Sequence, residues 1–270
     1  MLTLESVSYR YAGAPRPSLH DVSLEFAQGE VVGLVGASEA GKTTLCLVLS
    51  GLAPRTVGGT LTGRMLLDGD DVSDLAMHQL AGGIGIAFAN PATQHTGVAT
   101  TVYEEVAFGP MNLGLPRDEV IERTESSLAA RDPARLSGGQ QQLVAIAGLL
   151  AQRPAHLVLD EPTAQLDPAG TRMVAAALGQ LASGGASIVV AEQKTDLLAA
   201  ICDRVVVLEG GRVVMDGPAA EVLASARLPE LGVAAPAAVR LRRAAAAAGL
   251  ATGATRRLEQ AIAGVERTLA

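Results

Sequence analysis

The spacing of apolar residues predicts two kinds of β-strand. Residues 2–9 and 22–26 alternate apolar and polar positions, as expected for strands with one buried face in an antiparallel sheet. Other segments are short continuous apolar runs, which are typical of strands buried on both faces of a parallel sheet: residues 31–35, 84–88, 156–159 and 187–190. Near the carboxyl end, residues 205–208 and 213–215 flank Glu209-Gly210-Gly211-Arg212 and predict a hairpin.

Helical patterns separate these strands. One follows the first apolar run from Thr44, and the others are expected at 101–108, 117–130, 143–151 and 170–181. A further short strand is expected at 63–67. This alternation predicts an α/β fold with a mainly parallel core sheet and an antiparallel β subdomain.

A glycine-rich loop follows the strand at 31–35. Its sequence, Gly36-Ala37-Ser38-Glu39-Ala40-Gly41-Lys42-Thr43, fits the phosphate-loop pattern GxxxxGK(S/T), and a helix opens at Thr44. Glycines let backbone N–H groups face one anion, and the helix N-terminus adds positive charge there. We expect Lys42 to contact the β- and γ-phosphates of a nucleotide and Thr43 to hold Mg²⁺. The alternative is a glycine turn before a helix that binds no ligand.

Two details of this loop affect its interpretation. The chain has only two lysines, Lys42 and Lys194, so a chance Gly-Lys-Thr is less expected. Glu39 stands where the common pattern has a small residue, and its negative charge near the phosphates predicts weakened nucleotide affinity.

A second candidate anion site precedes the apolar helix at 143–151. Ser137 is a suitable N-cap, and Gly138, Gly139 and Gln140 follow it at the predicted helix start. Alone, this pattern is weak evidence for a ligand.

Two adjacent carboxylates end the apolar strand at 156–159. Asp160 at the strand end suits a Mg²⁺ ion, and Glu161 points to the other side, where it can polarise an attacking water. The alternative is an acidic strand end without a role. Tyr11 could stack on an adenine ring, although a plain strand or turn tyrosine is equally compatible with the sequence.

Composition narrows the classes of protein. The chain has 270 residues, a net charge of −7 and a pI near 5.2, which argue against a general nucleic-acid binder. It has no run of 18 apolar residues, so we expect no membrane span, and residues 1–11 lack the features of a secretory signal. Two cysteines, Cys46 and Cys202, are too few for a disulfide framework and fit a reducing cytoplasm.

Taken together, GASEAGKT, LSGGQ and LVLDEPTAQLD, in this order, resemble ATP-binding-cassette (ABC) transporter ATPases over residues 2 to 225. NPATQ, VAFGPMNLGLP and LSGGQQQLVAIAG are similar, more narrowly, to the ATP-binding subunit of energy-coupling-factor transporters. Those import vitamins and metal ions through a transmembrane T component and a substrate-binding S component. The segments at 45–47 and 231–233 are similar to the branch in which one polypeptide carries two cassettes.

The resemblance implies that two cassettes form a head-to-tail homo- or heterodimer and sandwich ATP and Mg²⁺ between the phosphate loop of one and LSGGQ of the other. It implies adenine stacking for Tyr11 and phosphate binding for residues 36–44. Asp160 would hold Mg²⁺ together with Thr43, and Glu161 would be the general base, with Gln193 at the position of a switch histidine. Across the dimer, Ser137, Gly138, Gly139 and Gln140 would face the partner's ATP, together with the carboxylate of Asp167. The protein would be cytoplasmic and peripheral on the inner face of the membrane.

The chain also departs from the family pattern. Ala89 replaces a glutamine that touches Mg²⁺ and the attacking water, and Gln94 could reach in only if the loop folds differently. Gln193 replaces the switch histidine, and an amide can donate a hydrogen bond to a phosphate but cannot carry a proton. The segment before LSGGQ looks short for the family, and Leu143 replaces a usual basic residue. These departures predict a slow, degenerate ATP site that pairs with a more competent cassette.

We expect a nucleotide-binding domain over residues 1–225, with a shortened helical subdomain at about 90–150, and an Ala/Arg-rich, helical tail over 226–270. In the tail, Leu258, Ile262, Val265 and Leu269 fall on one helical face. This face would cover the protein's own domain, join a second cassette or dock on a partner cassette.

Other classes remain open. The absence of long heptad repeats argues against a chromosome-organising cassette, and the single acidic cassette argues against a translation factor. A cassette that binds ATP for regulation without hydrolysing it, or an ATPase of another ABC transporter class, stays an alternative.

Overall fold

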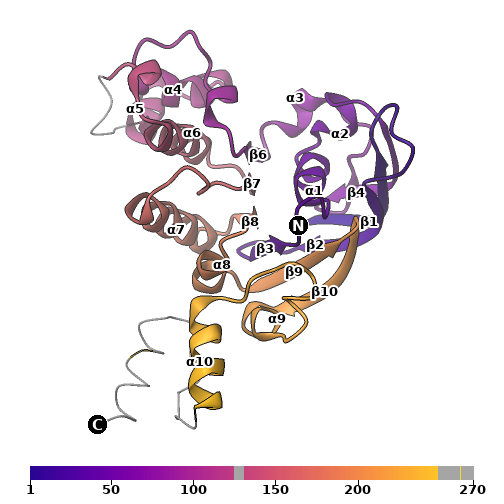
Figure 1. The fold of residues 1–270 in the computed structure, drawn as a ribbon. Helices are drawn as coiled ribbons and strands as arrows, with labels where there is room; N and C mark the ends of the chain where they lie inside the picture. Colours follow the sequence, from indigo (N-terminus) through magenta and orange to yellow (C-terminus); the bar gives the residue numbers. More distant parts are fainter. Residues whose placement is uncertain (125–130, 249–261, 263–270) are drawn as a thin grey trace.

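A computed structural model describes residues 1–124, 131–248 and 262. Its core is a six-stranded sheet with the strand order β10-β9-β3-β8-β7-β6 (Figure 1). The strands are β3 (Val31–Val35), β6 (Ile84–Ala87), β7 (His156–Asp160), β8 (Ser187–Ala191), β9 (Arg204–Glu209) and β10 (Arg212–Pro218). All neighbouring pairs are parallel except the β9–β10 hairpin, which confirms the predicted parallel core and the hairpin.

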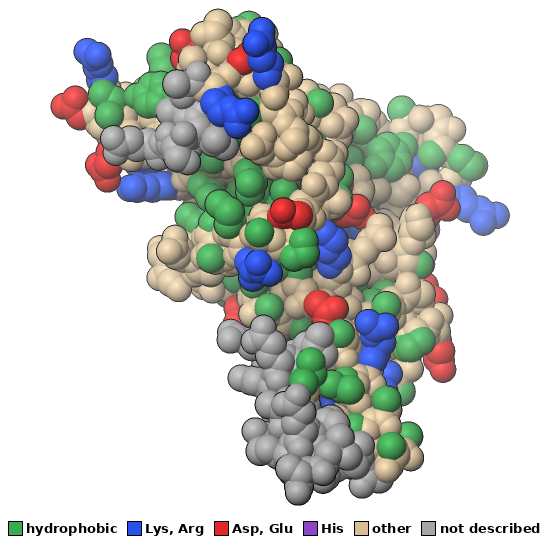
Figure 2. Space-filling model, turned by 60° about the vertical axis from the view of Figure 1, so that its left-hand side comes forward, with side chains coloured by type: hydrophobic (Ala, Val, Ile, Leu, Met, Phe, Trp, Pro, Cys, Tyr) green, Lys and Arg blue, Asp and Glu red, His purple; other side chains and the backbone are tan. Residues whose placement is uncertain are grey.

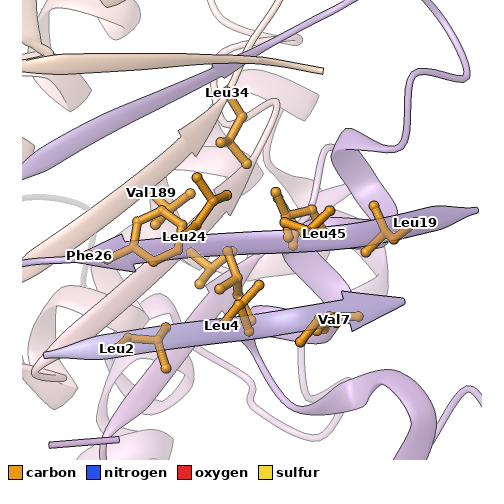
Figure 3. Close-up of a cluster of buried hydrophobic side chains, with 14 of the residues drawn as sticks. Leu2, Leu4, Val7, Leu19, Leu24, Phe26, Leu34, Leu45 and Val189 are labelled. Atoms are coloured by element: carbon orange, nitrogen blue, oxygen red, sulfur yellow. The ribbon is translucent and has the colours of Figure 1, made fainter. Parts of the chain in front are cut away.

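A second sheet is antiparallel and has the order β2-β1-β4-β5. It comprises β1 (Leu2–Arg10), β2 (Leu19–Phe26), β4 (Thr60–Leu67) and β5 (Asp70–Asp71). Its inward side chains share a core with α1 (Lys42–Leu49) and the central sheet, as Figure 3 shows for Leu4, Leu24, Leu45 and Val189. This shared core fixes the phosphate loop, which lies between β3 and α1.

Three helices lie together at the end of the molecule opposite the antiparallel sheet (Figure 1). They are α4 (Val102–Asn112), α5 (Arg117–Thr124) and α6 (Gly138–Gln152). Val102, Val106, Leu136 and Val144 form a small separate core between α4 and α6. The remaining helices are α2 (Leu52–Arg55), α3 (Met77–Leu80), α7 (Pro168–Ser183), α8 (Thr195–Ile201), α9 (Ala219–Ala224) and α10 (Ala237–Ala247).

Helix α6 begins at Gly138, directly after the predicted N-cap Ser137, because Ser137 and Gln140 form a reciprocal capping box that starts the helix before its apolar residues from 143. Other predicted boundaries were too short. Helix α4 continues past Phe108 to Asn112 with Pro110 inside it, and β4 starts at Thr60 rather than 63. The helix predicted over 117–130 is described to Thr124, and residues 125–130 lie outside the described part.

The tail is described through α10. Its first turn is tied to α8, since the Ala237 amide donates to Asp196 and the Thr195 hydroxyl donates to the carbonyl of Ala234. Of the predicted apolar stripe, only Ile262 is described, and it is exposed; Leu258, Val265 and Leu269 lie outside the described residues. In the described part of the chain, no helix combines the length and apolarity needed to cross a bilayer.

Candidate nucleotide site

The phosphate loop has the curled backbone that its sequence predicts. It leaves β3 at Gly36, whose φ of 157° and tight packing require glycine, because a Cβ there would lie 2.4 Å from the carbonyl oxygen of Leu208. Glu39 has a φ of 63°, which is unusual for a residue with a side chain, and its side chain is exposed. The loop therefore presents its backbone to one side and projects a carboxylate from its tip.

Lys42 closes the loop on itself. Its Nζ donates to the carbonyl oxygens of Gly36 at 2.8 Å and Ala37 at 2.9 Å, and the residue is only 7% exposed. An ammonium group held in this way sits at the centre of the loop, where it can meet incoming phosphate oxygens.

A cavity of about 450 Å³ opens beside this loop. Of the sequence-predicted residues, those at 38–44, Glu161 and Gln193 line it. Pro17, Ser18, Gly210 and Gly211 also line it and were not predicted as site residues. The Gly211 amide donates to the carbonyl of Ala40 at 3.0 Å, so the β9–β10 turn braces the phosphate loop. The Gly210-Gly211 pair predicted only a hairpin turn, and nothing in the local sequence placed that turn at the loop.

Asp160 lies behind the loop at the end of β7. It is 6% exposed, and its Oδ1 has no hydrogen-bond partner among the described residues. Burial raises the pKa of this carboxyl above its ordinary value, while a hydrogen bond from Thr43 and the charge of Lys42 act in the opposite direction. A buried carboxylate oxygen without a partner, next to a threonine hydroxyl, is a donor set that suits Mg²⁺.

Glu161 follows in a backbone conformation that turns it away from Asp160. Its φ is 51°, and its amide donates to the carbonyl of Ala191 at 2.8 Å, which ties the end of β7 to β8. Its carboxylate accepts a 2.7 Å hydrogen bond from the side-chain amide of Gln193. The two carboxylates thus occupy different environments, as the sequence predicted: one buried behind the loop, the other on the cavity wall.

The second predicted anion site does not reach this cavity. Ser137 accepts a hydrogen bond from the Gln140 amide and caps α6, and none of the four residues at 137–140 lines the cavity. Asp167 caps α7 by accepting from the Gly170 amide at 2.7 Å. Within one chain, Ser137 and Asp167 are therefore engaged in capping α6 and α7, and neither lines the cavity at the phosphate loop.

Gln94 does not replace the glutamine that is missing at position 89. Its Oε1 accepts from the Phe88 amide and its Nε2 donates to the Ile86 carbonyl, each at 2.9 Å, so the side chain is bound to the edge of β6. The Ala89 carbonyl instead accepts a 3.4 Å hydrogen bond from Gln165. The loop after β6 therefore lends no side-chain amide to the cavity.

Tyr11 contacts the site only at its edge. Its hydroxyl lies 3.1 Å from the Thr44 hydroxyl, and its ring meets the Tyr9 ring edge-on with centroids 4.9 Å apart. Tyr11 is half-buried and is not a cavity-lining residue. Its role in adenine stacking stays a prediction.

One buried acid near the site was not predicted. Glu192, next to Gln193, is 2% exposed and accepts hydrogen bonds from both the amide and the hydroxyl of Thr163. A charged residue at the end of an otherwise apolar strand was the available signal, because buried carboxylates require partners.

The chain resembles known proteins along its length. A family model described as ABC transporter matches residues 19–164. An ABC transporter ATP-binding protein of Pyrococcus abyssi is 36% identical over 279 aligned positions, which cover all of this chain and 99% of the relative. The energy-coupling factor transporter ATP-binding protein EcfA2 of Symbiobacterium thermophilum is 39% identical, covering 89% of this chain and 86% of the relative.

Among solved structures, cbiO1 from Clostridium perfringens, described as part of the ABC transporter complex cbiONQ, superimposes with a TM-score of 0.72. It is 32% identical and covers 86% of this chain and 96% of its own. By contrast, the chain spans only 39% of an ABC transporter ATP-binding relative from Methanosarcina acetivorans. The matching fold, the family model and the full-length relative together identify the chain as a member of the ABC transporter ATPase family, an ATP-binding enzyme with the P-loop cassette fold.

Proposed function

We propose that this chain is the ATP-binding subunit of an energy-coupling-factor type importer, in which ATP binding and hydrolysis drive uptake of a vitamin or a metal ion through membrane subunits. The observation that carries the proposal is the separation of the phosphate-loop cavity from the 137–140 segment within one chain. The similarity to EcfA2 and to cbiO1 supports the transporter class.

In this proposal, Mg²⁺-ATP enters the cavity beside residues 36–44. The Lys42 ammonium leaves the Gly36 and Ala37 carbonyls for phosphate oxygens, and Tyr11 stacks on the adenine. Thr43 and Asp160 would hold the metal, which neutralises phosphate charge when bound. Glu161 on the cavity wall orients and deprotonates the attacking water.

The other half of each ATP site would come from a second cassette, which is either identical to this chain or different from it. Ser137, Gly138, Gly139, Gln140 and Asp167 of each chain would face the nucleotide bound by the other. A Cβ at Gly138 would lie 2.6 Å from Oε1 of Gln165, so glycine lets the start of α6 pack against the loop before α7, and the helix N-terminus there favours an anion. The signature segment, residues 137–140, would then complete the partner's nucleotide site. This would explain why the segment starts a capped helix but does not line the cavity of its own chain.

The T component would dock on the part of the molecule that carries α4, α5 and α6, and it would connect the chain to the S component. Large apolar side chains are exposed there: Val98 at 74%, Phe108 at 43%, Met111 at 64% and Leu113 at 40%. Phe108 also lines a groove of about 120 Å³ between α4 and α6. Figure 2 looks onto this side of the molecule and shows hydrophobic side chains at its upper end. Docking here would hold the protein at the cytoplasmic face of the membrane.

The same proposal includes slow hydrolysis. Ala89 brings no side-chain amide to the cavity, Gln94 is bound to β6, and Gln193 cannot accept a proton. Loss of one contact that acts in the transition state typically costs about 10²–10³ in rate. We therefore propose that this cassette binds ATP and turns it over slowly unless it is paired with a more competent one.

The domain organisation belongs to the proposal as well. The cassette would span residues 1–225, with the helical subdomain at about 90–150, and the tail residues 226–270; of the tail, Leu228, Leu231 and Val233 are buried in the same core as the central sheet. The Thr195 hydroxyl donates to the carbonyl of Ala234 and Asp196 accepts from the amide of Ala237, which supports a tail that is attached to the cassette's own α8.

Three measurements test the function. Titration of the purified chain with a fluorescent ATP analogue and Mg²⁺ should show saturable binding, and Lys42→Ala should weaken it about 10- to 100-fold through loss of a charged hydrogen bond. Glu161→Gln should retain ATP and accumulate the nucleotide-bound dimer. Co-expression with a candidate multi-helix T component should give a complex that survives purification in detergent.

A non-hydrolysing regulatory cassette makes a different prediction. In that case, Glu161→Gln and the unchanged chain would hold ATP for equal times. Equal ATP affinity of the unchanged chain and Lys42→Ala would contradict the nucleotide site itself.

A further inference from the structure

The buried carboxylate of Glu192 lies at the junction of two loops that carry site residues. One loop follows β7 and runs from Glu161 to Asp167, and the other follows β8 and carries Gln193. Glu192 is 2% exposed and Thr163, its partner in the first loop, is fully buried.

Each carboxylate oxygen of Glu192 holds one loop. Oε1 accepts from the Thr163 amide at 3.1 Å and from the Thr163 hydroxyl at 2.6 Å. Oε2 accepts from the backbone amides of Gln193 at 3.1 Å and Lys194 at 3.3 Å. Four donors converge on one buried charge, so its desolvation is offset only while both loops keep this arrangement.

Two further contacts join the loop after β8 to the loop after β7. Lys194 Nζ donates to the Thr163 carbonyl at 2.5 Å, and the Gln193 side-chain amide donates to Glu161 at 2.7 Å. Moving either loop would therefore change the direction of the Glu161 carboxylate. The Glu192 side chain itself does not line the nucleotide cavity.

We propose that Glu192 is a positioning residue for hydrolysis: by binding Thr163 and the backbone at 193–194, it sets the orientation in which Gln193 holds Glu161. The proposal rests on the ATP site proposed above and adds to it a residue that acts through Gln193. It assigns Glu192 an effect on the rate of hydrolysis and little effect on nucleotide binding, because the phosphate loop makes none of these contacts.

The sharpest variant is Glu192→Gln, which keeps the shape of the side chain. Its amide NH₂ would face either the backbone N–H groups of Gln193 and Lys194 or the backbone N–H of Thr163, whose hydroxyl can turn to accept. In either orientation at least one backbone N–H loses its acceptor and meets another donor. Single-turnover hydrolysis, with protein in excess of labelled ATP, should slow about 10- to 100-fold, as expected for a misplaced catalytic group. The Kd for Mg²⁺-ATP should change less than about threefold.

Two further variants serve for comparison. Glu192→Asp keeps the charge and should recover part of the rate. Glu221→Gln changes an exposed carboxylate of α9 in the same way and is the matched control.

A double-mutant cycle separates positioning from plain destabilisation. In the Gln193→Ala background, the link to Glu161 is absent, so Glu192→Gln should slow hydrolysis much less than it does in the unchanged chain. Its effect on the free energy of unfolding should be the same in both backgrounds. Equal slowing in both backgrounds would overturn the proposal, as would a parallel loss of ATP affinity.

Hydrogen exchange gives a readout that does not need hydrolysis. In nucleotide-free Glu192→Gln, peptides covering 161–167 and 192–196 should exchange faster, while peptides covering the phosphate loop should be unchanged. Unchanged exchange in the two loops would overturn the proposal even if the chain hydrolyses ATP. Absence of ATP binding in every variant would instead overturn the proposed function, and exchange would still decide whether Glu192 fixes the loops.

Discussion

The side-chain amide of Gln193 donates a 2.7 Å hydrogen bond to the carboxylate of Glu161 across the ends of β8 and β7. Glutamine is therefore able to orient the carboxylate, as a histidine would, but it has no titratable nitrogen. A histidine at this position could both orient the Glu161 carboxylate and transfer a proton or carry charge. Gln193 can only orient it.

Gln193→His should therefore accelerate hydrolysis. An imidazole at this position can keep the contact with Glu161 and also carry positive charge towards the γ-phosphate, so we expect a gain of about tenfold or more, a fraction of the 10²–10³ that one such contact supplies. Phosphate release by the purified chain measures it. Gln193→Ala is the control, since it removes the orienting amide and should be slower than the unchanged chain. Equal rates for the histidine and alanine variants would contradict the assigned role.

Glu39 should weaken ATP binding through its charge. The side chain is exposed at the tip of the phosphate loop and lines the cavity. Replacing it with Gln removes the charge at constant size, and we expect affinity for Mg²⁺-ATP to rise about three- to tenfold at low salt. The gain should shrink as ionic strength increases.

Backbone strain at Glu39 is tested separately. Its φ of 63° is one that glycine adopts freely, so Glu39→Gly should also stabilise the folded chain by about 1 kcal/mol. Comparing the Gln and Gly variants in ATP titrations and in urea unfolding distinguishes charge from strain. An affinity gain limited to the Gly variant would show that charge is not the cause.

Asp160→Asn should stabilise the nucleotide-free protein at neutral pH. Burial raises the pKa of Asp160 in the folded state above its unfolded value, so ionisation of this group opposes folding at pH 7. The advantage of the Asn variant should shrink as the pH falls below the folded pKa, where the native carboxyl becomes neutral, and should disappear near the lower pKa of the unfolded chain. Urea unfolding at pH 7 and at pH 4 measures this, and the same variant should lose Mg²⁺-dependent ATP binding. An Asn variant that is less stable at pH 7 would contradict the prediction.

His156 should make the protein sensitive to mild acid. It is 2% exposed at the start of β7, neither ring nitrogen has a hydrogen-bond partner within residues 1–124, 131–248 and 262, and burial lowers its pKa below the ordinary 6.5. Below about pH 6.5 the unfolded chain takes up a proton more readily than the folded one, so stability should fall with pH until the lower folded pKa is reached.

The comparison that isolates this effect is His156→Leu. The variant should lose less stability between pH 7.5 and pH 5.5 than the unchanged chain in urea titrations. Identical pH dependence of the two proteins would show that another group is responsible. Both series should be run without nucleotide, since ligand binding would add its own contribution to stability.

The sequence by itself determined the parts of this protein that depend on neighbouring residues. The glycine loop between an apolar strand and a helix, the cap at Ser137 and the paired carboxylates at 160–161 follow from local backbone preferences, and the structure has each of them. Alternation against continuous apolar runs was enough to assign β1 and β2 to an antiparallel sheet and β3, β6, β7 and β8 to a parallel one, while the pairing of β4 with β1 came only from the structure. These features require only the immediate chain.

Tertiary structure decided which of these pieces meet. That Gly211 braces Ala40 and that Glu192 joins the loops after β7 and β8 depend on segments tens of residues apart. Gln94 is close in sequence to its partners Phe88 and Ile86, but the fold of the loop decides that it turns back onto β6 and not into the cavity. Hydrogen bonds of buried groups choose partners by proximity in the folded sheet, and the order of strands, not the order of residues, sets that proximity. For the same reason, the spacing of motifs could not show that the signature segment at 137–140 and the cavity of one chain lie apart.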